Sequence, residues 1–169
     1  MTLEREALQN RLHLAGIGLC AWLVGTSPWV SMFRRIPSGA GFLDWAHVVL
    51  GLVALLVGAL YLGACTRGGR WRLYFPWLIG RVRPAARDFV GLLRGRLPSA
   101  EGGGLFAAIE GLLLLALLVV GLTGAAWFVL QGSAEVVACR TVHIVAARVL
   151  TGLIVAHVLA VATHVVELA

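Results

Sequence analysis

Four long apolar stretches limit what this chain can fold into. They cover about residues 12–30, 45–64, 105–130 and 141–166. Each is long enough to cross the hydrocarbon core of a bilayer as a helix, which takes about 20 residues. Because lipid offers no hydrogen-bond partners, the backbone groups of each stretch must be satisfied within a helix. The sequence therefore predicts an all-α integral membrane protein, with residues 1–169 forming a single four-helix bundle.

The composition excludes a soluble enzyme. Hydrophobic residues make up 60% of the 169 residues and charged residues only 13%, whereas a soluble domain has about 45–50% and about 25%. The formal net charge of +6 does not indicate a nucleic-acid partner, because basic residues in membrane proteins usually mark cytoplasmic loops. The first stretch is too long for a signal peptide and lacks a cleavage site before Pro28, so we expect it to be retained.

The distribution of arginine predicts the orientation of the chain. Ten arginines lie in the N-terminal segment and in the long link between the second and third stretches, against three in the two short links. The positive-inside rule then places both termini and the long link in the cytoplasm. Within that link, Pro84–Arg94 is predicted to form a short amphipathic helix on the inner leaflet, with docking of a cytoplasmic partner as the alternative.

Histidines lie within or at the edges of the stretches, where ionisable side chains are costly and often functional. With the N-terminus inside, His13 lies near the inner end of the first stretch and His47 near the outer end of the second. His143 lies near the outer end of the fourth stretch, and His157 follows 14 residues later, about 21 Å deeper along a helix. One histidine alone could be a hydrogen-bonded packing residue. The matched depths instead predict an outer pair, His47 with His143, and an inner pair, His13 with His157.

His143 and His157 project from one face of the fourth stretch, because 14 residues turn a helix through nearly whole turns. Each therefore has one partner at its own level on another helix. Two imidazoles per level suit iron in a planar macrocycle better than zinc, which takes three or four converging ligands. Four glycines near these histidines would leave room for such a ring, or serve ordinary helix packing. They are Gly16, Gly18, Gly51 and Gly152.

The run from His143 to His157 resembles the last span of the bacterial di-haem cytochrome b561 superfamily. This superfamily includes the gamma subunits of formate dehydrogenases and the b-type cytochrome subunits of nickel–iron hydrogenases. Residues Pro76–Pro98 are also similar to the gamma subunits. The resemblance implies a multi-pass protein of the bacterial inner membrane that binds two haem b groups. It implies axial iron ligation by His47 and His143 in one haem and by His13 and His157 in the other.

Three further residues are candidate site residues. Arg148, inside the fourth stretch, would pair with a propionate of the outer haem, or reach the outer head groups. Glu110, near the inner end of the third stretch, would carry protons to a quinone site, or favour the helix start electrostatically. His164 lies where stand-alone cytochrome b561 proteins have a histidine beside a quinone-type site, so the resemblance places it with Glu110 at that site.

These features predict an electron-transfer protein that links a periplasmic donor to membrane quinone. The donor would be an iron–sulfur, hydrogenase or dehydrogenase subunit that carries the catalysis and docks on the short outer loops around Arg34, Arg35 and Arg140. The alternative is a stand-alone cytochrome b561 that acts as a superoxide:quinone oxidoreductase, with Arg34 and Arg35 attracting the anion. A third possibility is a haem-free transporter or scaffold.

Overall fold

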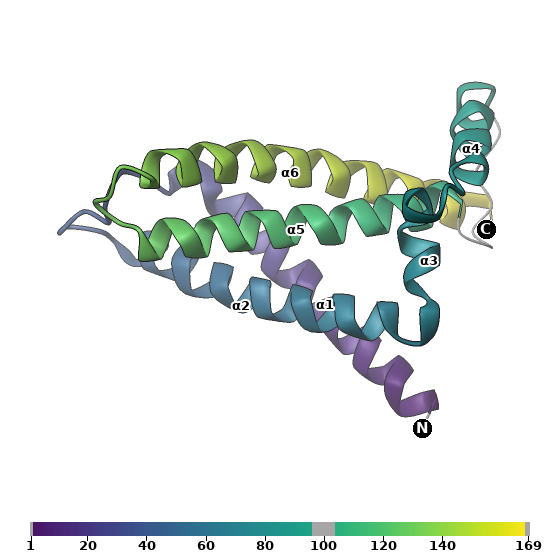
Figure 1. The fold of residues 1–169 in the computed structure, drawn as a ribbon, viewed down its shortest axis with the longest axis horizontal. Coiled ribbons are helices and arrows are strands. Elements are labelled where there is room, and N and C mark those ends of the chain that lie inside the picture. Colours follow the sequence, from purple (N-terminus) through teal and green to yellow (C-terminus); the bar gives the residue numbers. More distant parts are fainter. Residues whose placement is uncertain (1, 96–103, 168–169) are drawn as a thin grey trace. The chain divides into compact units, whose positions relative to one another are not determined.

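The protein folds almost entirely into helices, in agreement with the predicted all-α class (Figure 1). The computed structural model describes residues 2–95 and 104–167, with side chains described for residues 4, 6–95 and 104–162. The helical share is 83%, and no strand occurs in the described ranges. The elements are α1 (Thr2–Thr26), η1 (Ser27–Trp29), α2 (Phe42–Thr66), η2 (Arg67–Gly69), α3 (Trp71–Tyr74), η3 (Pro76–Ile79), α4 (Arg83–Leu93), α5 (Leu105–Val129) and α6 (Val136–Glu167).

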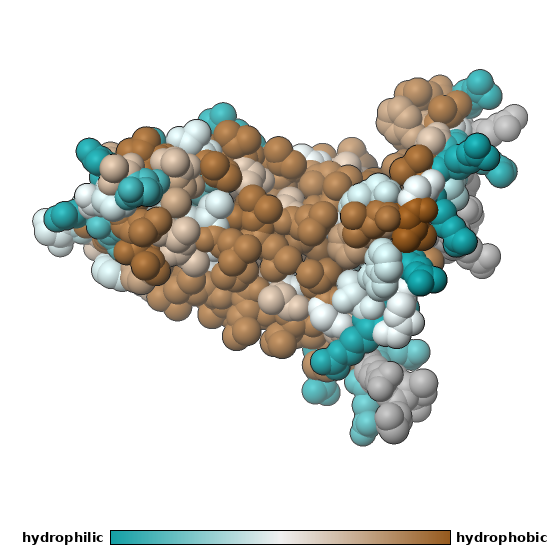
Figure 2. Space-filling view, viewed as in Figure 1, coloured by the Kyte–Doolittle hydropathy of each residue, from teal (hydrophilic) through white to brown (hydrophobic). Residues whose placement is uncertain are grey.

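Three helical stretches are long and apolar enough to cross a membrane: Phe42–Gly69, Leu105–Val129 and Val136–Ala162. Only 6–17% of each apolar window is buried within the chain, and Figure 2 shows apolar side chains covering the visible faces of the helices. Such surfaces fit lipid, since soluble monomers rarely expose large contiguous apolar patches. Helix α1 is not among these three stretches, because the polar residues Gln9, Asn10, Arg11 and His13 lower its mean hydropathy.

The ends of two helices differ from the prediction. Helix α1 ends at Thr26 rather than continuing to Val30, because Pro28 lacks an N–H and restricts the residue before it. Helix α6 begins at Val136, five residues before the predicted start at Thr141. The helix includes the charged Arg140, which the apolar stretch excluded, because a helix can extend beyond the residues that contact lipid.

The chain divides into two compact parts. The first part comprises Met1–Ala64 and Ala116–Leu150, and the second comprises Cys65–Leu115 and Thr151–Ala169. Within the first part, α2 and α5 approach closely where a Cβ on Gly58 would meet Leu117 and a Cβ on Gly121 would meet Leu55. Small residues at such contacts let helix backbones pack closely in lipid.

Two loops of the first part are joined at one end of its helices. They follow η1 and α5, and they lie together at the left of Figure 1. The Gly132 amide donates to the Arg34 carbonyl at 3.0 Å, and the Ile36 amide donates to Gln131 Oε1 at 2.8 Å. Trp127, which is buried, donates from Nε1 to the Phe33 carbonyl at 2.8 Å. These bonds fix the loop after η1 against the ends of α5 and α6.

In the second part, α4 forms where the amphipathic helix is predicted, within one residue at each end. Asp88 lies on the polar side of this helix and is partnered rather than only solvated. Its Oδ2 accepts a hydrogen bond from the Leu105 amide at 2.9 Å, and any side chain on Gly104 would overlap it. Asp88 therefore caps the first turn of α5, where a carboxylate satisfies a free backbone N–H and favours the helix dipole.

Replacing Asp88 with alanine is expected to destabilise the chain by about 1 kcal/mol, because a first-turn N–H of α5 loses its acceptor. The midpoint of thermal unfolding in detergent should fall by about 2–4 °C. Asp88→Asn is the matched control, since its side-chain oxygen can still accept this bond. An unchanged midpoint in Asp88→Ala would mean that the cap contributes no stability.

Candidate functional site

The predicted outer histidine pair is brought together in the first part. His47 lies in the second turn of α2 and His143 lies in the second turn of α6. Both side chains are half-buried, and their rings are close enough to interact electrostatically. Two imidazoles from different helices therefore lie within electrostatic range of each other in the first part.

The ring of His143 is held in one orientation by α5. Its Nδ1 lies 2.9 Å from the Val120 carbonyl and 3.5 Å from Thr123 Oγ1. A carbonyl can only accept, so Nδ1 carries the proton and Nε2 keeps its lone pair for a metal. A backbone carbonyl behind the ring is the usual support for a metal-bound histidine. Gly124 makes room for this ring, since a Cβ there would lie 3.1 Å from His143 Cε1.

Two of the predicted ligands carry a buried nitrogen without a protein partner. Nδ1 of His47 and Nδ1 of His157 are buried and form no hydrogen bond in the structure. Buried polar atoms are rarely left unsatisfied in folded proteins. Both histidines therefore have the unmet bonding capacity expected of side chains that contact a bound group.

His13 lies on α1 and contacts a residue that the sequence did not single out. Its ring stacks on Tyr61 of α2, with ring centroids 5.4 Å apart and planes inclined by 11°. One turn earlier, Gln9 Nε2 donates to the Ala64 carbonyl at 2.9 Å. Tyr61 follows His47 by 14 residues, the same spacing that separates the two α6 histidines, and this spacing could have revealed it. His157 belongs to the other compact part, so its pairing with His13 stays a prediction.

The four glycines near the histidines in the sequence make no close helix contact at their Cβ positions in the structure. A Cβ on any of them would meet nothing within 4 Å. The helix contacts instead use other glycines, among them Gly58 and Gly121. The space at these positions leaves their predicted role, room for a flat ring system, as a prediction. The four glycines are Gly16, Gly18, Gly51 and Gly152.

Arg148 is exposed on α6, five residues after His143. It forms no hydrogen bond or ion pair with another residue whose side chain is described. This exposed position is compatible with pairing to a haem propionate and with contact to lipid head groups, and both roles stay predictions.

Glu110 lies in a polar cluster of the second part. Its half-buried carboxyl interacts electrostatically with Tyr74, and a side-chain hydrogen bond joins Tyr74 to the buried Cys65. Burial, followed by the neighbouring Cys65 and Glu110, raises the pKa of Tyr74 to about 12. Tyr74 therefore stays protonated and can donate a hydrogen bond at any physiological pH. The side chain of His164 lies outside the described residues, so its predicted place beside Glu110 stays a prediction.

The donor set favours haem over a clustered metal ion. Among the residues that the structure describes, no group of three or more His, Cys, Asp or Glu side chains gathers around a point. Two imidazoles from different apolar helices, one of them with Nε2 free, are the kind of donor set that a b-type haem uses. Such a donor set is typical of a membrane cytochrome of the b type.

A comparison with family models supports this class. The model described as prokaryotic cytochrome b561 matches residues 6–168, so the chain belongs to the prokaryotic cytochrome b561 family. The family binds b-type haem and carries out transmembrane electron transfer. Comparisons with curated proteins and with solved structures gave no match.

Proposed function

We propose that this chain conducts electrons across the bacterial inner membrane through two b-type haems, between a periplasmic redox partner and quinone. It would serve as the membrane-anchor cytochrome b subunit of a respiratory oxidoreductase. The observation that carries the proposal is the orientation of His143, whose Nδ1 is fixed by the Val120 carbonyl while the ring lies within electrostatic range of His47. Each haem, when bound, supplies a one-electron redox centre.

At the outer site, His47 and His143 would hold the iron from opposite helices. The Val120 carbonyl keeps the His143 ring in one tautomer, and Gly124 lets the ring lie close to α5. Apolar side chains of the surrounding helices would exclude water from the site. Arg148 would pair with a propionate there.

At the inner site, His13 and His157 would supply the two imidazoles. Tyr61 supports this assignment, because its stacking holds the His13 ring against α2. The unsatisfied Nδ1 of His157 supports it from α6. For His13 to lie at the inner site, α1 must cross the membrane together with α2, α5 and α6 in a four-helix bundle. The apolar second half of α1 would then lie in lipid.

The orientation follows from the arginines, with both termini and the link that contains α4 on the cytoplasmic side. Helix α4 suits the lipid interface, because Phe89 is 53% exposed and Leu93 is 73% exposed on its apolar side. Arg83, Arg87 and Arg94 are exposed on the other side, where they can reach anionic head groups.

Quinone would react near Glu110 at the inner end of α5. Tyr74 can donate a hydrogen bond to a quinone oxygen, and Glu110 can pass protons from the cytoplasmic side. His164, in the last turns of α6, would complete the site. On the periplasmic side, an iron–sulfur, hydrogenase or dehydrogenase subunit would deliver electrons to the outer haem.

A reduced-minus-oxidised spectrum of the purified chain, with haem quantification, tests the proposal. We expect a b-type band and two haems per chain. A protein that is folded in detergent but shows no such band would overturn the function, and one haem per chain would overturn the two-level pairing.

Replacing His164 with alanine is expected to leave both haems in place and to slow quinone reduction by at least tenfold, since general acid–base groups contribute about 10²–10⁴ in rate. The rate is measured as reoxidation of the reduced haems by a soluble quinone. Thr163→Ala is the neighbouring control. A normal rate in His164→Ala would remove this residue from the site.

A further inference from the structure

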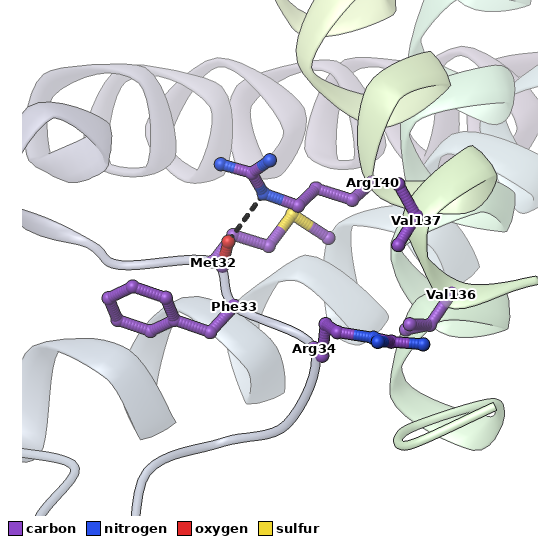
Figure 3. A pocket seen from close by; sticks show the side chains of 6 residues that line it. All are labelled: Met32, Phe33, Arg34, Val136, Val137 and Arg140. Carbon is purple, nitrogen blue, oxygen red and sulfur yellow. Dashed lines mark hydrogen bonds between the residues drawn. The ribbon is translucent and has the colours of Figure 1, made fainter. Parts of the chain in front are cut away.

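A pocket of about 190 Å³ lies beside the joined loops of the first part. A single water molecule needs only about 15 Å³ of such space, so the pocket can take a whole side chain. Its walls come from the loop after η1 and from the first two turns of α6 (Figure 3). The lining residues are Met32, Phe33, Arg34, Val136, Val137 and Arg140.

The two pocket arginines are fixed by main-chain contacts. Arg34 Nη2 donates to the Ser133 carbonyl at 3.3 Å, and Arg140 Nε donates to the Met32 carbonyl (Figure 3). Each guanidinium has five N–H donors, so several remain free in each. Both side chains are exposed, and the free donors can reach a ligand without a change in the loop.

The acidic side chains at this end of the first part do not neutralise these arginines. Asp44 accepts from the Ser31 and Gly41 amides, at 3.3 Å and 3.0 Å. Glu135 is exposed, and no ion pair joins either carboxylate to Arg34 or Arg140 within the described side chains. The pocket therefore combines uncompensated positive charge with apolar walls, of which Phe33 is 57% exposed and Val137 is 46% exposed.

We propose that this pocket is the anchor point for an acidic surface segment of the redox partner, which inserts a carboxylate flanked by an apolar side chain. A single guanidinium can recognise a carboxylate with two parallel hydrogen bonds, and Arg beside apolar contacts is typical of interface hot spots. Arg35 is not part of this anchor, because its guanidinium lies over Gly132 instead of lining the pocket. The identity of the partner in this inference rests on the proposed function. The chemistry of the pocket does not depend on it.

The test uses a fluorescein-labelled peptide with paired glutamates and leucines, and its glutamine counterpart, titrated into the detergent-solubilised full chain. We expect the glutamate peptide to bind in a salt-sensitive manner and the glutamine peptide not to bind. Arg34→Gln and Arg140→Gln should each weaken binding by about tenfold, while Arg35→Gln, with the same loss of charge, should stay within about twofold. Val137→Glu should abolish binding, because it adds a negative charge to the pocket wall. This variant keeps the hydrogen bond from Arg140 to Met32, so it still tests the pocket if Arg140→Gln does not fold.

Three results would overturn the pocket. The first is that the glutamine peptide binds as tightly as the glutamate peptide, and the second is that all three arginine variants weaken binding equally. The third is that inorganic phosphate displaces the peptide at a phosphate concentration equal to the peptide's dissociation constant, which would indicate a site for small anions. Haem is quantified in the same samples. Because peptide binding needs no haem, a haem-free chain that binds the peptide would overturn the proposed function and leave the pocket intact.

Discussion

Replacing His143 with alanine is expected to remove one of two haems from the purified chain. This variant lacks the imidazole that the Val120 carbonyl orients. Because a b-type haem is held by its axial ligands and by packing, we expect the haem to be lost with that imidazole. His47→Ala should remove the same haem, since the two rings lie together. Haem per chain should fall from two to one in either variant, and the double variant should lose no more than either single one.

The matched control is Val145→Ala, an exposed apolar position two residues after His143 on α6. It should keep both haems. His13→Ala should remove the other haem, so that His13→Ala combined with His143→Ala leaves none. Retention of two haems in both His47→Ala and His143→Ala would show that these residues are not ligands.

Replacing Gly111 with alanine is expected to destabilise the chain by about 1–3 kcal/mol, the usual cost of overpacking. A Cβ at this position would overlap the Tyr74 carbonyl oxygen, which is backbone and cannot turn away. Helix propensity alone predicts the opposite sign, because alanine in a helix is more favourable than glycine by about 1 kcal/mol. The thermal unfolding midpoint in detergent therefore decides between the contact and the propensity.

Gly63→Ala in α2 is the control for this prediction. A Cβ there meets nothing within 4 Å, so only the propensity gain remains and the midpoint should hold or rise. If Gly111→Ala raised the midpoint as Gly63→Ala does, the close approach of Tyr74 to α5 would be wrong.

The helices were predictable because lipid leaves the backbone few alternatives. The four apolar stretches overlap α1, α2, α5 and α6, and amphipathic spacing predicted α4. The ends were less predictable. Apolar content marks where a chain contacts lipid, whereas Pro28 and the turns around Val136 decide where the helix stops and starts.

The electrostatic proximity of His47 and His143 was also predictable, because depth along a straight helix follows from residue number. The groups that hold these and other side chains in place were not predictable. The contact of His143 with the Val120 carbonyl involves a backbone group, so no residue type in the sequence indicates it. The role of Asp88 as a helix cap was also not predictable, because it depends on the start of α5 lying beside α4. Tyr74 and Cys65 are close in sequence, but only folding of the link brings them to Glu110.

The 14-residue interval occurs twice, from His47 to Tyr61 on α2 and from His143 to His157 on α6. No loop interrupts either interval, so the separation of the two levels is fixed by the helical rise alone. Substitutions within these intervals leave that separation unchanged. A single inserted residue between His143 and His157 would turn one of them by about 100° relative to the other. Related sequences are therefore expected to keep the number of intervening residues constant, even where residues without a role at the site or in helix packing differ.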